Sequence, residues 1–179
     1  MSVCGVTLVS ADGVSVTVPG AIAWQQIGLL QGLAALDEGG TTEMPPVELD
    51  FPAAVVQGVV AYLVNPDRRV AEIPKPLTAP VDHFAKAWEM DFARDMERCD
   101  LLLPLLECSC YLRIDALHGL LAAFVAQRIE EISKAAPSIM EGAERVRQYL
   151  HLANEWTPEE MTHLEEEMRY AKEVDPGAY

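Results

Sequence analysis

The sequence predicts a mixed α+β fold in which a small sheet and a helical bundle are followed by a C-terminal helical extension. Two β-branched runs flank an Asp-Gly pair within residues 6–18, a pattern typical of a β-hairpin. Apolar residues then recur at helical spacing over much of residues 51–132. From residue 133 the segments become shorter and more acidic. We therefore expect one domain over residues 1–132 and a helical extension over residues 133–179.

The first elements follow from the turn-forming residues between the apolar runs. In VTLVSADGVSVTV, Gly13 accepts the positive φ of a tight turn, and Pro19-Gly20 ends the second strand. Residues 21–36, AIAWQQIGLLQGLAAL, have the spacing of a single helix, although Gly28 weakens it. The composition of residues 37–46 predicts a loop, and residues 47–49 are expected to form a short strand.

The next helix is expected over AAVVQGVVAYLV, because Pro52 fits a first helical turn and Asn65-Pro66 stops the pattern. This segment is apolar almost all round, which predicts a buried helix. Residues 67–80 are rich in proline and polar residues, so we expect an exposed connection. Residues 81–92 then resume a helical pattern, as one helix or two short ones.

Residues 101–132 are the most hydrophobic part of the chain, and we expect two core helices there, separated at Arg113-Ile114-Asp115. In the extension, residues 133–144 contain at least one turn, and residues 144–152 form a short helix. Thr157, Pro158 and Glu160 form a capping box that opens a last, acidic helix. That helix carries a thin apolar stripe of Met161, Leu164 and Met168.

Charge and composition narrow the range of functions. The formal net charge is −15, which disfavours binding to nucleic acid or to anionic membranes and favours a basic or apolar protein partner. We expect no membrane span and no secretory signal, because no apolar run is long enough and the N-terminus lacks a basic region followed by an apolar one. Four cysteines, of which Cys108 and Cys110 cannot easily bridge each other, suit a reduced compartment, so we expect the cytoplasm, the nucleus or both.

A catalytic or metal site is considered first at ECSCYLRIDALH, where Cys108, Cys110 and His118 lie close in sequence. A structural zinc site needs four ligands, and positions i and i+2 of a helix point in nearly opposite directions. Burial as core residues is therefore the favoured interpretation. No nucleophile elbow, phosphate-binding loop or dinucleotide motif is present. We expect no enzyme activity, no metal and no cofactor, and an enzyme built on these three residues is the disfavoured alternative.

Protein binding is the function that the extension favours. Tyr149, Leu150 and Trp156 lie in a segment of short helices too small to bury all of its own apolar residues. Apolar patches with aromatic anchors are typical of protein-binding surfaces. The same residues can instead pack back on the domain, and this alternative stays open.

Four stretches, in order, resemble the S-phase kinase-associated protein family, the F-box-binding adaptors of Skp–cullin–F-box ubiquitin ligases. VTLVSADGVSVTV is similar to that family's first two strands and turn, and DEGGTTEMPPVELD to its acidic loop before a buried helix. AWEMDFARDMERCDLLLPLLECSCYLRIDALHGLL resembles its Trp-x-x-x-Phe segment and two core helices. ERVRQYLHLANEWTPEEMTHLEEEMRYA resembles its C-terminal F-box-binding module.

The resemblance implies a BTB/POZ fold with C-terminal helices, no catalytic activity, and a role that links an F-box-type protein to a cullin scaffold. It implies that the cullin contact includes Cys110 and Tyr111. It also assigns the F-box-type contact, and the helix beneath that contact, to Leu117, Leu121, Val125, Val146, Leu150, Leu152 and Trp156.

The chain departs from the family pattern at the cullin-facing turn. The family usually has Ala-Ala-Asn-Tyr there, whereas this chain has Cys108-Ser109-Cys110-Tyr111, so Cys110 replaces an asparagine that helps to engage the cullin. His118 stands where the family prefers leucine. These departures motivate an alternative function: a structural subunit of a non-ligase assembly that holds an F-box-like partner in the same helical groove.

Overall fold

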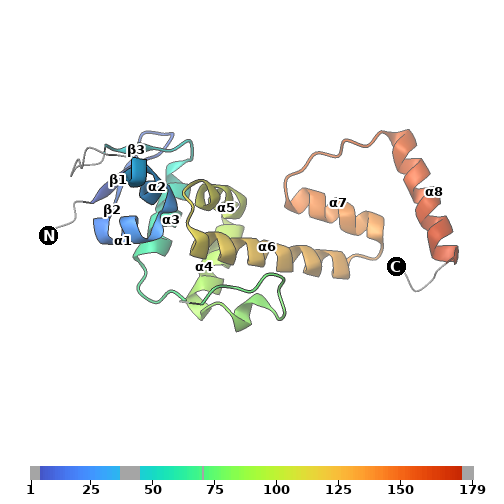
Figure 1. Ribbon diagram of the computed structural model, residues 1–179. Coiled ribbons are helices and arrows are strands. Elements are labelled where there is room, and N and C mark those ends of the chain that lie inside the picture. Colours follow the sequence, from blue (N-terminus) through green and yellow to red (C-terminus); the bar gives the residue numbers. More distant parts are fainter. Residues whose placement is uncertain (1–4, 37–44, 70, 175–179) are drawn as a thin grey trace. The chain divides into compact units, whose positions relative to one another are not determined.

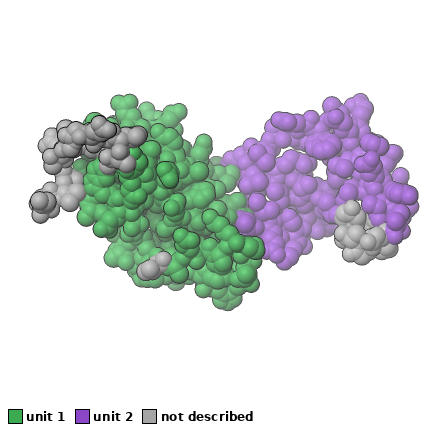
Figure 2. All heavy atoms as spheres, in the orientation of Figure 1, with its two compact units in different colours: residues 1–125 green, residues 126–179 purple. Residues whose placement is uncertain are grey.

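The computed structural model describes residues 5–36, 45–69 and 71–174 (Figure 1). Within these residues the fold is mixed α+β and mostly helical, with one three-stranded sheet and eight α-helices. The predicted small sheet and α+β class are confirmed. The chain divides into two compact units, residues 1–125 (unit 1) and 126–179 (unit 2), with the division inside helix α6 (Figure 2).

The sheet of unit 1 has the strand order β2-β1-β3. Strands β1 (Val6–Val9) and β2 (Ser15–Val18) form the predicted antiparallel hairpin, with Leu8 opposite Val16. Strand β3 (Val47–Glu48) is the predicted short strand, and it pairs with β1 in parallel. The sheet lies beside α1, α2 and α3 (Figure 1).

The hairpin turn also caps a helix. Gly13 has a φ of 78°, and its N–H donates to the Ser10 carbonyl at 2.9 Å, as the Asp-Gly pair predicts. The Asp12 carboxylate accepts a hydrogen bond at 2.8 Å from the N–H of Ala53, the first residue of α3. Hydrogen bonds from the Ser10 side chain and then from backbone N–H groups lower the pKa of Asp12. The turn and the start of α3 are therefore held together.

The single helix predicted over residues 21–36 is wrong, because the structure has α1 (Gly20–Gln26) and α2 (Gly28–Leu36). Ile27 between them is extended, and the N–H of Gly28 donates to the Arg113 carbonyl at 3.2 Å. A Cβ at position 28 would lie only 3.0 Å from both the Cβ and the carbonyl oxygen of Arg113. Glycine is favoured there because another part of the backbone approaches so closely.

Helix α3 (Ala53–Val64) has the predicted burial, with six buried residues, but along one face only. It packs against β2, α1 and α5. Its opposite face is exposed and consists of Ala54, Gln57, Ala61 and Val64.

The connection over residues 67–80 is only partly exposed, because Arg69 and Ile73 are buried within it. The helical pattern of residues 81–92 resolves into a 3₁₀ turn, η1 (Val81–His83), and helix α4 (Ala87–Arg98). Tyr62 stacks obliquely on Trp88 and Phe92, with ring centroids 5.5 and 5.8 Å away. Aromatic packing thus joins α3 to α4.

The two predicted core helices are α5 (Leu102–Tyr111) and α6 (Asp115–Ala135), and the predicted break between them is confirmed. The fully buried side chains of unit 1 come from the sheet and from α1 to α6, together with the residues that join them. The largest are Leu8, Ile27, Leu30, Tyr62, Leu63, Glu89, Leu105, Leu112, Ile114, Leu117, Leu120 and Leu121.

Unit 2 contains the end of α6 and helices α7 (Ile139–Tyr149) and α8 (Pro158–Val174). Helix α7 starts earlier than the predicted residue 144, because the Ser138 side chain caps it by accepting from the Glu141 N–H at 3.2 Å. The predicted capping box of α8 is confirmed: the Thr157 N–H donates to Glu160 at 2.8 Å, and the Glu160 N–H donates to Thr157 Oγ1 at 3.2 Å. In the part of the chain that the structure describes, no helix has the length and apolar composition that crossing a bilayer requires.

Candidate partner-binding surface

The residues assigned to the F-box-type contact fall into both units. Leu117, Leu121 and Val125 lie on the part of α6 that belongs to unit 1, and all three are buried. Leu117 and Leu121 have no accessible surface at all. Their role in this structure is therefore to hold the helix in the core of unit 1.

The other four residues lie in unit 2 and are more accessible. Val146 and Leu150 are half-buried on α7 and at its C-cap. Leu152 is 58% exposed and Trp156 is 50% exposed, both in the segment that follows α7. A large apolar side chain left in water forgoes the stabilisation that burial would give. These two residues are the accessible apolar anchors of the predicted site.

The backbone around Leu152 explains why this leucine is held where it is. His151 has a φ of 56°, its N–H donates to the Gln148 carbonyl at 3.2 Å, and the Leu152 N–H donates to the Arg147 carbonyl at 2.8 Å. This is a Schellman motif, in which an apolar residue follows the left-handed one and usually packs on the end of the helix. Here that apolar residue is exposed.

The same motif ends α5 in unit 1. Arg113 has a φ of 54°, its N–H donates to the Cys110 carbonyl at 3.1 Å, and the Ile114 N–H donates to the Ser109 carbonyl at 2.9 Å. Ile114 occupies the position that corresponds to Leu152 and is only 1% exposed. The apolar residue of the motif is thus buried at the end of α5 and exposed at the end of α7.

Helix α4 supplies a third example. Asp100 has a φ of 58°, and its N–H donates to the Glu97 carbonyl at 3.1 Å. The Leu101 N–H donates to the Met96 carbonyl at 2.9 Å, and the Leu101 side chain is half-buried. Among these three helix ends, only that of α7 leaves its apolar residue exposed.

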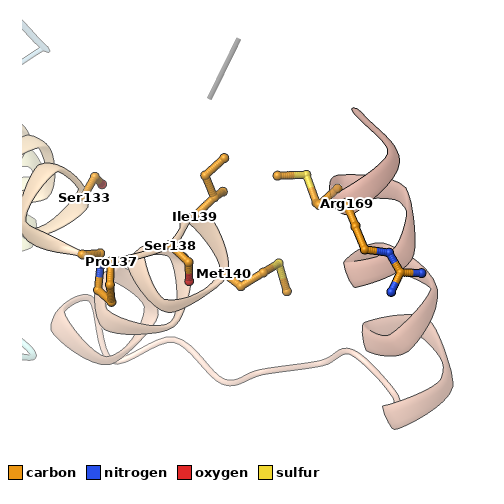
Figure 3. Close-up of a pocket in the computed structure, with 8 residues that line it drawn as sticks. Ser133, Pro137, Ser138, Ile139, Met140 and Arg169 are labelled. Carbon is orange, nitrogen blue, oxygen red and sulfur yellow. The ribbon is translucent and has the colours of Figure 1, made fainter. Parts of the chain in front are cut away.

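Unit 2 also contains a hollow between the α6–α7 turn and α8, with a volume of about 480 Å³ (Figure 3). Its lining is mainly apolar and consists of Ser133, Ala136, Pro137, Ser138, Ile139, Met140, Met168 and Arg169. The apolar stripe of α8 supplies Met168 to this lining, and Met161 and Leu164 on the same stripe are half-buried. The stripe was predictable from the sequence, whereas the hollow was not predicted. The Pro137-Ser138 pair, a helix stop followed by a helix cap, was the available sign of it.

The residues assigned to the cullin contact lie at the end of α5. Cys110 is exposed, and Tyr111 is 54% exposed. The ring of Tyr111 lies 6.3 Å from that of Phe51, at an interplanar angle of 56°. An accessible tyrosine beside a second aromatic ring can anchor a protein contact.

Cys108 and Cys110 point to opposite sides of α5, as their spacing predicts, because one is buried and the other exposed. Burial, and then the nearby Glu107 charge, raise the pKa of Cys108 to about 12, so its thiol stays protonated and unreactive at neutral pH. In the described part of the chain, no group of three or more His, Cys, Asp or Glu side chains is arranged to hold a metal ion.

A buried polar network in unit 1 was missed by sequence analysis. Arg69 and Glu89 form an ion pair at 2.7 Å, with side chains that are 5% and 0% exposed. The Tyr62 hydroxyl donates to the same Glu89 oxygen at 2.9 Å, and Arg69 also donates to the Ala116 carbonyl. Burial, with an added contribution from Glu89, raises the pKa of Tyr62. The network joins α3, α4 and α6 through the connection that was expected to be exposed.

No protein-family model matches this chain, and no curated protein matches it significantly.

Proposed function

We propose that the chain is a non-catalytic adaptor that resembles the F-box-binding subunit of Skp–cullin–F-box ubiquitin ligases. In this proposal unit 1 is a BTB/POZ-type domain, and unit 2 is the extension that holds an F-box-type helical partner. The order of the elements supports it: a hairpin, a short parallel strand, a helix, the Trp88–Phe92 segment, two core helices and a capped acidic helix. Leu152 and Trp156 supply the apolar anchors.

The observation that carries the proposal is the exposed leucine at the end of α7. Of two other helix ends of the same type, in unit 1, one buries its apolar residue, Ile114, and the other half-buries Leu101, whereas Leu152 is left in water. Trp156 lies four residues on and is also exposed. A partner helix that covers both would bury apolar surface as the core of unit 1 does. A stable complex buries about 1,200–2,000 Å² in total, with a few aromatic or apolar anchors contributing most of the affinity.

The proposed cullin contact lies on unit 1, at the end of α5. Cys110 and Tyr111 are both accessible there, and Phe51 lies beside Tyr111. The buried Cys108 and Ser109 on the same turn hold that end of α5 in the core. The two accessible residues can therefore meet a scaffold without any change in the fold of unit 1.

The experiment is affinity purification of the tagged full chain from its own cells, followed by mass spectrometry. We expect several F-box-type proteins and a cullin. Replacing Leu152 and Trp156 together by serine should remove the F-box-type proteins. Replacing Tyr111 by alanine should remove the cullin alone.

A matched control variant also replaces two exposed apolar side chains, but on unit 1. Val14 and Val64 are exposed apolar residues of unit 1, and replacing both by serine should leave capture unchanged. All these sites are exposed, so each change should shift the free energy of unfolding by about 0.5 kcal/mol or less. Equal capture by the Leu152/Trp156 variant and the wild-type chain would exclude the proposal.

The second candidate is a structural subunit of a non-ligase assembly that holds an F-box-like partner through unit 2. The replacement of the family's asparagine by Cys110, on an accessible turn, favours it. The same purification distinguishes the two. A constant set of subunits without a cullin supports this second function.

A further inference from the structure

We propose that one surface of unit 2, on α8, selects a helix that carries lysine or arginine on both sides of its apolar face. The surface consists of the apolar stripe of α8 (Met161, Leu164 and Met168), which contributes to the wall of the hollow, and the exposed glutamates along that stripe. The inference rests on the proposed function, since it names the chemistry of the partner that unit 2 would hold.

The acidic residues of unit 2 differ in whether the chain itself neutralises them. On α6 and α7 the acids are paired within their own helices, in the ion pairs Arg128–Glu131, Lys134–Glu130, Arg145–Glu141 and Arg147–Glu144. Helix α8 has six glutamates against one arginine and one lysine, a formal charge of −4. Among its described side chains the only ion pair joins Glu167 to His163, at 3.3 Å.

Several of these glutamates lie along the two edges of the apolar stripe of α8. At about 3.6 residues per turn, Met161, Leu164 and Met168 share one face of α8. Glu165 flanks one edge of that stripe, and Glu160 and Glu167 flank the other. All of them are exposed, whereas the stripe is half-buried. A partner that lays an apolar face on the stripe therefore brings its own flanking residues next to carboxylates.

The hollow supplies room for an apolar anchor of such a partner. Ile139, Met140 and Met168 line it, and methionine side chains adapt to the shape of what they contact. In Figure 3 Met140 extends from α7 toward α8.

Among helices with the same apolar face, the charge of the flanking residues decides which one binds. Exposed ion pairs contribute little each, but several of one sign steer association and reject a partner of like charge. This attraction is screened by salt, with a Debye length of about 10 Å at 0.1 M. Binding of the selected helix should therefore weaken as salt rises, whereas a purely apolar contact would not.

The test uses the full chain and three synthetic amphipathic peptides of about 20 residues, which is about 30 Å of helix. The first has leucine on one face and lysine along its edges, the second has glutamate at the edges, and the third keeps the lysines but has serine for leucine. We expect the first to bind at least about tenfold more tightly than either of the others. Its affinity should fall between about 0.05 and 0.5 M salt.

Two variants with the same change in charge show where on α8 the selection occurs. Glu165→Lys with Glu167→Lys alters the edges of the stripe, and Glu166→Lys with Glu173→Lys alters the opposite face. The first pair should weaken binding of the lysine-edged peptide about tenfold, and the second about threefold at most. Circular dichroism checks that both keep their helices.

Equal weakening by both pairs, or equal binding of the lysine-edged and glutamate-edged peptides, would overturn the inference. In the second case binding through an apolar face alone would persist, and the proposed function would stand. Absence of binding by all three peptides also overturns the inference, while the purification of native partners judges the proposed function separately.

Discussion

Helix α5 in unit 1 and helix α7 in unit 2 end in the same backbone motif, yet their apolar end residues have opposite environments. Ile114 is buried and Leu152 is exposed, although both follow a left-handed residue and both make the same two backbone hydrogen bonds. The local motif satisfies the backbone but does not decide whether its apolar residue is covered. In unit 1 the chain itself supplies the cover, and in unit 2 a partner is proposed to do so.

The two units also differ in where their charged side chains lie. Unit 1 buries a complete pair, Arg69 with Glu89, and ties it to Tyr62. Unit 2 keeps its charges on the surface, and the glutamates of α8 have a single described ion pair among them. Buried charges in unit 1 therefore serve its own fold, whereas the charges of α8 are available to another molecule.

The largest expected effect comes from separating the buried pair. Replacing Glu89 by leucine should lower the free energy of unfolding by about 3–5 kcal/mol, because Arg69 is then left buried and uncompensated. Urea titration of the full chain measures it. The double variant with Arg69→Met should be more stable than the Glu89→Leu single variant. A single variant as stable as the wild type would show that unit 1 does not depend on the pair.

Truncation of the two equivalent end residues should give unequal effects. Ile114→Ala should cost about 2–5 kcal/mol, since it opens a cavity in a packed core. Leu152→Ala should change the free energy of unfolding by about 0.5 kcal/mol or less, because that side chain is mostly in water already. Parallel urea titrations compare them. Similar costs at both positions would remove the difference between the units.

The left-handed residue of the α5 motif provides a smaller test. Arg113 is not glycine, so its positive φ carries a steric cost that glycine would avoid. Arg113→Gly should raise the free energy of unfolding by about 0.5–1 kcal/mol, measured by thermal and urea denaturation. Arg113→Ala retains the Cβ and should give no such gain. A gain with alanine would point to the lost side chain rather than to the backbone.

The smallest effect concerns pH and is confined to unit 2. Hydrogen bonds from Thr157 lower the pKa of Glu160 below its ordinary value of 4.5. The cap therefore stabilises α8 fully above that ordinary value and is lost as pH falls through the lowered pKa of the folded state. NMR shifts of the first turn of α8 should report fraying in acid. Glu160→Gln should reduce this acid dependence, and an unchanged profile would contradict the assignment.

Features set by neighbouring residues could be predicted from the sequence. The Asp12-Gly13 turn, the break at Arg113-Ile114-Asp115 and the capping box at Thr157 each depend on a few adjacent residues, and all are found in the structure. Features set by distant contacts could not be predicted. The break at Ile27 depends on the carbonyl of Arg113, and the burial of Arg69 depends on Glu89.

The same distinction applies to the candidate site. The sequence identifies Leu152 and Trp156 as apolar residues in a short helical tail, which is a local property. Their accessibility depends on what packs nearby, and Ile114 shows that an equivalent position can be fully covered. The hollow beside Met140 and Met168 likewise requires α7 and α8 to be placed in space, which no periodicity in the sequence specifies.

The bond from Asp12 to the start of α3 has a practical consequence for protein engineering. It joins residues 41 positions apart, and the pairing of β1 with β3 fastens the same region a second time. The hairpin and the region around β3 and the start of α3 are thus fastened together at two points, whatever the length of the chain between them. Each doubling of such a connection costs only about 0.6 kcal/mol of closure entropy. Lengthening the chain between them should therefore cost unit 1 little stability.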